Sequence, residues 1–309
     1  QKSKLIEYIL KSMPIHLTFL FCSFRSSSME GLSLDEIFQR GEKLRRGKNK
    51  NLEEAVKYYR YGSDQGSIDC RYSYAKMLYQ GDGVPMDKKT AVELIKTCAD
   101  TNHKDAVYAY ARLLYKGVDI TIKYFERAIE LKSSHLSEAY YNLALLYYYD
   151  RGDQEKAIIC TDEAIKHGNI DAIAFYGELV EQYIIENSEK KYYEYFQEAM
   201  DKGSYVGMRD YALYIGHTAE NPDQFDEYAR LIKKAADHGD LPAIIEYIDW
   251  TKDENEKIKY TEMAANLGDE NSIIEYAKLI HSGEVECNEN EAKMHYQKAA
   301  DLEHVGSFY

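Results

Sequence analysis

The sequence predicts an all-α protein, an α-α superhelical solenoid of about eight antiparallel helix pairs. Three observations predict this fold. A unit with a small residue, a tyrosine-rich apolar stripe and a glycine returns about every 36 residues. Apolar residues within a unit recur at helical spacing. Glycine-rich or polar turns separate the apolar stretches. Self-similarity at this period is typical of solenoids, in which each repeat packs on its neighbours instead of around one core.

The copies follow one another along most of the chain. Four clear copies run from Ala55 to Gly66, Ala157 to Gly168, Tyr192 to Gly203 and Tyr228 to Gly239, and degenerate copies begin at Ala91, Thr121, Lys257 and Ala292. Successive copies begin 36, 30, 36, 35, 36, 29 and 35 residues apart. We therefore expect one repeat solenoid over residues 29–309.

The first 28 residues differ from the rest and have an uncertain role. Residues 5–24 are apolar but interrupted by Glu7, Lys11, Pro14 and His16, so they make a poor membrane span. Residues 12–24 have the length of a signal-peptide core behind a basic leader. The chain begins with Gln1, which leaves open that an upstream domain precedes it. Residues 1–28 are thus a linker, the tail of an upstream domain or a weakly signal-like stretch.

Residues 67–100 show one unit in full. The helical spacing of its apolar residues predicts a first helix over 68–80. Gly81 ends that helix in the left-handed conformation, and Pro85 follows in the turn. Asp87 then occupies an N-cap position, so we expect a second helix from Lys88. The residues expected in the core of this unit are Cys70, Tyr74, Ala75, Leu78, Ala91, Leu94, Ile95, Cys98 and Ala99.

The other copies repeat one pattern of residue size in the first helix of each pair. A large residue stands beside a small one at Tyr74-Ala75, Tyr110-Ala111, Leu143-Ala144, Tyr176-Gly177, Tyr211-Ala212 and Tyr276-Ala277. A small residue lets two helices approach closely while the neighbouring ring fills the groove between them. Alanine pairs end the second helix at Ala235-Ala236, Ala264-Ala265 and Ala299-Ala300. These positions should therefore be buried.

These residues resemble the Sel-1-like repeat family, a relative of the tetratricopeptide repeat. The match is closest at Gly81-x-Gly83-Val84-x-x-Asp87-x-x-x-Ala91 and at the ending Ala235-Ala236-Asp237-His238-Gly239. It covers roughly residues 35–309. Two copies depart from the pattern, because residues 132–137 replace the glycine turn and residues 117–119 shorten a linker. Those two copies look more like ordinary tetratricopeptide repeats.

The charge is uneven along the chain. Residues 1–60 hold 12 Lys and Arg against 7 Asp and Glu, and residues 61–309 carry a net charge of −19. Because Lys and Arg supply most of the affinity for phosphate backbones, we expect no nucleic-acid partner. The exception is a basic cluster, which could be a localisation signal or an anion patch but which we expect in a solvated loop between two helices. Its members are Lys43, Arg45, Arg46, Lys48 and Lys50.

The chain carries no motif of metal, cofactor or catalytic chemistry. Its five cysteines are widely spaced and contain no C-x-x-C, which favours a reducing compartment. Its nine histidines form no H-x-x-x-H, and paired acids such as those at 35–36, 53–54 and 269–270 stand at expected helix starts. We find no phosphate loop, nucleophile elbow or calcium loop. We therefore expect a protein that is not an enzyme and binds no cofactor and no metal.

The candidate binding residues come from the first helix of each pair. The family resemblance implies that this helix lines the concave side, so its residues outside the core form the candidate partner-binding stripe. They are Tyr72, Lys76, Tyr79, Tyr108, Arg112, Tyr115, Tyr141 and Tyr148. Tyrosine offers a large contact area with little rotamer entropy to lose. The alternative is packing, because 30 tyrosines in 309 residues indicate general use in the core. Later in the chain the stripe changes to Glu178, Glu181, Arg209 and His217.

The sequence thus predicts a non-catalytic interaction scaffold or adaptor that holds a peptide or a partner helix on its concave face. We expect other proteins or peptides as partners and no membrane insertion, and the sequence leaves the oligomeric state open. The resemblance implies two alternatives: a regulatory or targeting region of a longer enzyme such as a protein kinase, and an endoplasmic-reticulum ubiquitin-ligase adaptor. The expected location is the cytoplasm, or the endoplasmic-reticulum lumen if residues 1–28 act as a signal.

Overall fold

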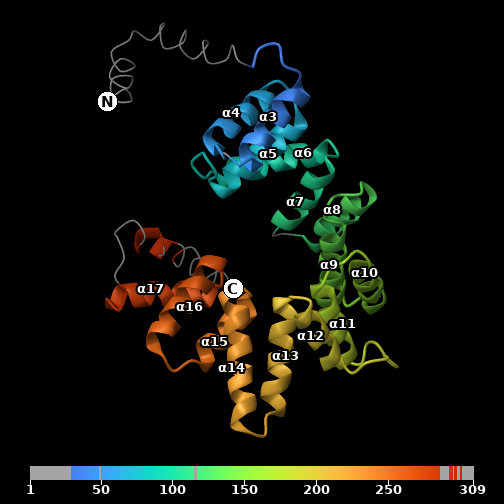
Figure 1. Ribbon diagram of the computed structural model, residues 1–309, viewed down its shortest axis with the longest axis vertical. Coiled ribbons are helices and arrows are strands. Elements are labelled where there is room, and N and C mark those ends of the chain that lie inside the picture. The colour runs from blue at the N-terminus through green and yellow to red at the C-terminus, as the bar shows by residue number, and fades with distance from the viewer. Residues whose placement is uncertain are drawn as a thin grey trace. The chain divides into compact units, whose positions relative to one another are not determined.

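The fold is built from helix pairs, as the repeats predict (Figure 1). The computed structural model describes residues 29–48, 50–114 and 117–285, with 292–294, 296–297 and 300. Within these residues it contains sixteen helices and no strand. The predicted N-terminal segment, 1–28, lies outside the described residues. The chain divides at Leu136 into two compact units, 1–136 and 137–309.

Unit 1 consists of three helix pairs in which each helix packs on the next one in sequence. The helices are α3 (Leu34–Arg46), α4 (Leu52–Asp64), α5 (Ile68–Gln80), α6 (Lys88–Asp100), α7 (Lys104–Leu113) and α8 (Val118–Glu130). A cluster of buried side chains joins α3, α4 and α5, with Ile37, Tyr59 and Met77 among its members. This packing fixes the faces of α3, α5 and α7 on which the candidate site lies.

Unit 2 continues the same pattern with packing between successive helices. Its helices are α9 (Leu136–Leu145), η1 (Leu146–Arg151), α10 (Gln154–Lys166), α11 (Asp171–Glu181), α12 (Tyr192–Asp201), α13 (Tyr205–Thr218), α14 (Pro222–Asp237), α15 (Leu241–Trp250), α16 (Glu254–Leu267) and α17 (Glu270–Ser282). The segment η1 is a π-helix, which the sequence did not predict. It turns Tyr147 into the core, leaves Tyr149 exposed and ends at Gly152.

The predicted unit at 67–100 is confirmed in its bounds and caps. Helix α5 runs from Ile68 to Gln80, and Gly81 follows with φ +77°. The Asp87 side chain accepts a hydrogen bond from the amide of Thr90 and caps α6. Most of the predicted core residues are buried, whereas Tyr74 and Leu94 are half-buried.

The predicted small positions are also buried. In the pairs of large and small residues, the alanines at 75, 111, 144, 212 and 277 are at most 6% exposed, and Gly177 is buried. The alanine pairs at 235–236 and 264–265 are buried in the same way. Residue 299 of the third pair lies outside the described residues.

The basic cluster departs from its expected place in a loop. Lys43, Arg45 and Arg46 form the last turn of α3, and Arg45 and Arg46 both pair with Glu42 in that helix. Cations are favourable at a helix C-terminus because the carbonyl ends there carry partial negative charge. Only Lys48 and Lys50 lie in the connection to α4. Glu42 therefore neutralises part of the positive charge of this cluster.

Candidate functional site

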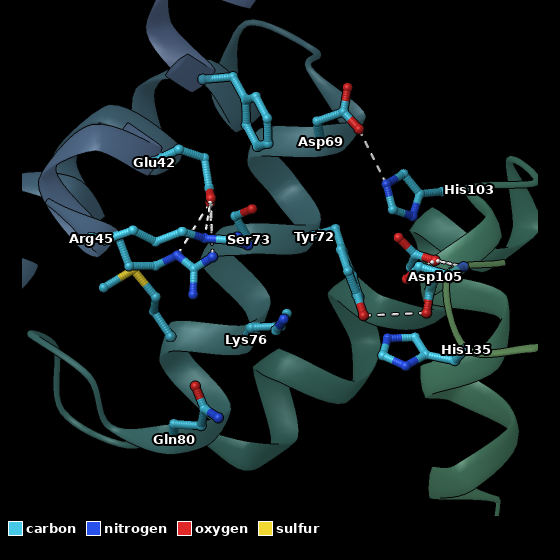
Figure 2. A pocket seen from close by; sticks show the side chains of 14 residues that line it. Glu42, Arg45, Asp69, Tyr72, Ser73, Lys76, Gln80, His103, Asp105 and His135 are labelled. Atoms are coloured by element: carbon cyan, nitrogen blue, oxygen red, sulfur yellow. Dashed lines mark hydrogen bonds and ion pairs between the residues drawn. The ribbon is translucent and has the colours of Figure 1, made fainter. Parts of the chain in front are cut away.

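Two neighbouring cavities of unit 1 lie along α3, α5 and α7, and Figure 2 shows the first of them. The first has a volume of about 340 Å³ and the second about 380 Å³. Both are lined by Tyr72, Lys76, Gln80 and His135, so the two cavities are neighbours. We call the two cavities together the α5–α7 groove. Every residue that lines it belongs to unit 1.

Tyr72 forms the centre of the groove. Its hydroxyl donates a hydrogen bond to the backbone carbonyl oxygen of Asp105, at 3.2 Å, and its ring packs on His103 with centroids 4.8 Å apart. Burial and the nearby Asp105 carboxylate raise the pKa of Tyr72 above its ordinary value. The Lys76 ammonium lies 5.6 Å from the centroid of the Tyr72 ring. Tyr72 is therefore a fixed, neutral wall that carries a cation on one face.

Tyr108 repeats this arrangement in the second cavity. It stacks on His135 with centroids 4.7 Å apart and an interplanar angle of 17°, and the Arg112 guanidinium lies 6.0 Å from its ring centroid. Tyr108 is only 5% exposed, because its ring also packs on Phe125. Its ring thus supports the groove floor, while Arg112 is exposed at the rim.

A charged network closes the groove at α3. Glu42 accepts hydrogen bonds from the Tyr59 hydroxyl at 2.6 Å and from Arg45 at 3.0 Å, and it pairs with Arg46 at 2.6 Å. Partial burial would raise the pKa of Glu42, but the Tyr59 hydrogen bond and the charges of Arg45 and Arg46 outweigh it and lower the pKa below 4.5. The Glu42 carboxylate is therefore ionised, and both arginines pair with it.

Asp105 is the carboxylate of the opposite wall. It accepts hydrogen bonds from the amide and hydroxyl of Ser134, each at 2.9 Å, and from the hydroxyl of Ser133 at 3.0 Å. Partial burial would raise its pKa, but these donors outweigh it and lower the pKa below 3.8. Its charge is therefore satisfied within unit 1.

Family comparison agrees with the residues that build these repeats. The model of the Sel1 repeat matches residues 26–67, 68–97, 137–169 and 272–304. The chain therefore contains four Sel1 repeats. Proteins with such repeats are commonly interaction scaffolds and are generally non-catalytic. The α5–α7 groove spans the first two matched repeats and the helix pair that follows them.

Two solved structures show the same fold. A Sel1 repeat protein from Oxalobacter formigenes is 21% identical, with a TM-score of 0.54 over 67% of this chain and 88% of that chain. A protective antigen with an SLR fold from uropathogenic Escherichia coli is 20% identical, with a TM-score of 0.52 over 90% of this chain and 63% of that chain. No curated protein sequence matches the chain. These similarities establish the Sel1-type solenoid architecture.

The structure gathers five of the eight predicted binding residues at the α5–α7 groove. Tyr72, Lys76, Tyr79, Tyr108 and Arg112 all line its second cavity. The binding role of these residues stays a prediction.

The other three predicted residues lie elsewhere. Tyr115 is outside the described residues. Tyr141 and Tyr148 lie in unit 2, where their rings pack on Phe175 at centroid distances of 6.3 and 5.6 Å. This aromatic cluster corresponds to the packing alternative, so we do not include Tyr141 and Tyr148 in the groove.

The sequence analysis missed the histidines and the α3 residues of the groove. His103 and His135 both line it, and the ring of each packs on a tyrosine of an earlier helix, tilted for His103 and stacked for His135. The same kind of contact joins Tyr140 to His167 and Tyr205 to His238 in unit 2. The four tyrosine–histidine separations are 31, 27, 27 and 33 residues, close to one repeat. That recurrence was a usable signal, but its irregular spacing made the histidines look scattered.

Unit 2 holds a smaller cavity of about 250 Å³ between α11, α12 and α13. Glu178, Glu181 and His217, which continue the predicted stripe, line it together with Asp210. Burial raises the pKa of Asp210 to about 6, although its partner Arg209 lowers it. Arg209 itself pairs with Asp210 and Asp240. Both residues therefore contribute to an internal ion-pair network.

The described residues contain no group of three or more His, Cys, Asp and Glu that could hold a metal ion. Among the same residues, no helix is both long and apolar enough to cross a membrane. Cys70, Cys98 and Cys160 are buried and form no disulfide. Burial raises the pKa of the Cys98 thiol to about 11, so this thiol is protonated near neutral pH.

Proposed function

We propose that the chain is a non-catalytic interaction scaffold whose α5–α7 groove holds an extended peptide or a partner helix. The observation that carries the proposal is the convergence of five predicted residues on one groove: Tyr72, Lys76, Tyr79, Tyr108 and Arg112. Their side chains come from equivalent positions of successive first helices, which is how a solenoid presents a continuous surface to a partner.

The chemistry of the groove supports binding to a protein segment. Tyr72 and Tyr108 are held by hydrogen bonding or stacking, so binding would cost them little conformational entropy. Tyr79 is half-buried and retains part of its ring for contact. Rigid aromatic walls beside exposed cations are typical of interaction hot spots. The two cavities together can hold several side chains of an extended segment.

The test is selection of short peptides from a random phage-displayed library on the full chain. The recovered peptides carry a photoreactive group, and mass spectrometry maps their cross-links. We expect cross-links on α5 and α7. We also expect Tyr79→Ala to weaken binding about tenfold, the size of a typical hot-spot loss.

The matched control is Tyr183→Ala, which removes a tyrosine that is 85% exposed and lies outside the groove. It should bind the peptides as the wild type does. Cross-links confined to other helices, or equal losses in the two variants, would contradict the proposal. Failure to recover any binding peptide would also contradict it.

A further inference from the structure

One local arrangement occurs three times among the described residues. The ring of a first-helix tyrosine packs on a histidine that follows the second helix of the same pair, and a cation stands four residues after that tyrosine. The three sets are Tyr72, Lys76 and His103; Tyr108, Arg112 and His135; Tyr205, Arg209 and His238. The spacing of four residues places the cation on the same helix face as the tyrosine. The three cations are thus equivalent by register.

Their electrostatic surroundings differ. Arg209 pairs with Asp210 at 2.7 Å and with Asp240 at 3.1 Å, and 17% of its side chain is exposed. Two carboxylates of unit 2 therefore neutralise this cation within the fold. Arg209 thus shows how the cation at this register position is arranged when nearby carboxylates neutralise its charge.

Lys76 and Arg112 have no such partner. Neither forms an ion pair with any carboxylate among the described residues, and both are exposed at the groove. The carboxylates that line the groove are engaged elsewhere, Glu42 with two arginines, Asp105 with two serines and Asp69 with His103. Two cations at the rim of a groove, with the local carboxylates already bound, leave an uncompensated positive potential there.

The electrostatic surroundings of Lys76 agree with this potential. Desolvation by the groove walls lowers the pKa of Lys76, and the positive charges of Arg45 and Arg46 lower it further, whereas the negative charges of Glu42 and Asp105 raise it by less. A negative group placed between these side chains would relieve that repulsion. The arrangement therefore favours an anionic ligand over a neutral one.

The division of charge between the two units agrees with this local picture. Residues 1–136 carry 23 Lys and Arg against 17 Asp and Glu, a net charge of +6, whereas residues 137–309 carry 16 against 36, a net charge of −20. The groove thus lies in the basic part of an acidic chain. Attraction of an anionic partner would be directed to unit 1.

We propose that the α5–α7 groove selects an acidic peptide segment, whose Asp or Glu carboxylates pair with Lys76 and Arg112. This proposal rests on the proposed peptide-binding function. The second cavity, which both cations line, also offers the half-buried Tyr79 and Leu113 to an apolar side chain of the same segment. Recognition therefore combines two carboxylates with an apolar anchor, which neither a free anion nor a neutral peptide supplies.

The experiment uses peptides recovered on the full chain by library selection. Each is synthesised again with Asn for Asp and Gln for Glu, which preserves shape and removes charge. Binding of both versions is measured with the wild type and with Lys76→Glu/Arg112→Glu. The control is Lys96→Glu/Lys123→Glu, which changes the net charge equally at exposed residues of α6 and α8 outside the groove.

We expect recovered peptides to carry more Asp and Glu than Lys and Arg. The Asn and Gln versions should bind at least about tenfold more weakly, because two ion pairs are lost. The groove double variant should lose at least as much, since it also introduces repulsion. The control variant should stay within about threefold of the wild type, because screening limits the effect of distant charges.

Several results would overturn the proposal. Groove-bound peptides without an acidic excess, or equal binding of the uncharged versions, would leave peptide binding standing and remove the charge selectivity. Equal losses of peptide affinity in the two double variants would mean that the net charge of the protein, and not the two groove cations, determines binding. A second copy would be the occupant if sedimentation shows a dimer that Lys76→Glu/Arg112→Glu dissociates. A single-stranded oligonucleotide that outcompetes the peptides would assign the groove to nucleic acid.

Discussion

Gly41 lies where α3 crosses the ring of Tyr59. A Cβ atom at this position would stand 2.5 Å from Cε1 of that ring, closer than real contacts allow. Tyr59 is fully buried, and its hydroxyl is hydrogen-bonded to Glu42, so the ring cannot move away without losing that bond. The first helix pair therefore requires a glycine here for close approach.

We expect Gly41→Ala to destabilise the protein by about 1–3 kcal/mol through overpacking. Helix propensity alone would predict the opposite change in stability, because alanine is about 1 kcal/mol more favourable than glycine inside a helix. In the background Tyr59→Leu, which removes the ring, the same change should be neutral or stabilising. Urea unfolding followed by circular dichroism measures all four members of the cycle. A stabilising effect of Gly41→Ala in the wild type would contradict the clash.

Glu42 makes the stability of this helix pair depend on pH. Its folded pKa lies below 4.5, since the Tyr59 hydrogen bond and the two arginines outweigh the effect of burial. A carboxyl with a lowered folded pKa stabilises the fold above its unfolded value and loses this contribution as the pH falls through the folded value.

We therefore expect Glu42→Gln to lower the melting temperature at pH 7, by an amount equivalent to about 1 kcal/mol after allowance for solvent screening. The difference from the wild type should shrink as the pH falls through the lowered folded pKa of Glu42, because the wild-type carboxyl then becomes protonated. The control is Glu93→Gln, which removes an exposed carboxyl of α6. An unchanged difference between pH 7 and pH 3 would show that Glu42 acts by packing alone.

At the scale of the helix, local signals were sufficient to predict the fold. The bounds of α5 and the Asp87 cap of α6 follow from residues next to them in sequence. The contacts of His103 and His135 were not predicted, because each packs on a tyrosine about one repeat earlier at an irregular separation. The π-helix η1 was not predicted either, because the apolar spacing of residues 146–151 does not distinguish a π-turn from an α-turn.

Ser204 both caps a helix and joins it to a neighbour. Its hydroxyl oxygen accepts a hydrogen bond from the amide of Gly207 at 2.9 Å and donates one to Asp171, at the start of α11, at 2.6 Å. The side chain is 1% exposed, so water cannot replace either partner. The loss of this hydroxyl should therefore affect α11 and α13 together.

We expect Ser204→Ala to cost about 2–3 kcal/mol, the sum of a lost cap and a lost hydrogen bond to a carboxylate. The comparison is Asn221→Ala, which removes an exposed cap that accepts only from the amide of Gln224. That change should cost about 1 kcal/mol. Thermal melting of the two variants measures the difference, and equal losses would show that the bond to Asp171 contributes nothing.

At the scale of the molecule, the contacts follow the order of the chain. Within each unit, helices pack mainly on the helices before and after them, and a solenoid of this kind transmits stability between neighbours. The sequence predicted this architecture from its repeats. It did not reveal that the groove residues would gather in the basic unit, because that depends on which side chains of α3, α5 and α7 share a face.

We expect a local defect in one unit to loosen that unit and leave distant helices protected. Gly41→Ala should speed amide hydrogen exchange in α3, α4 and α5 and leave α14 to α16 close to the wild type. Ser204→Ala should do the reverse, with faster exchange in α11 and α13 and little change in α3 to α5. Exchange followed by mass spectrometry resolves these segments in one experiment. If either substitution loosens both regions equally, the chain unfolds as one cooperative block, and nearest-neighbour coupling does not describe it.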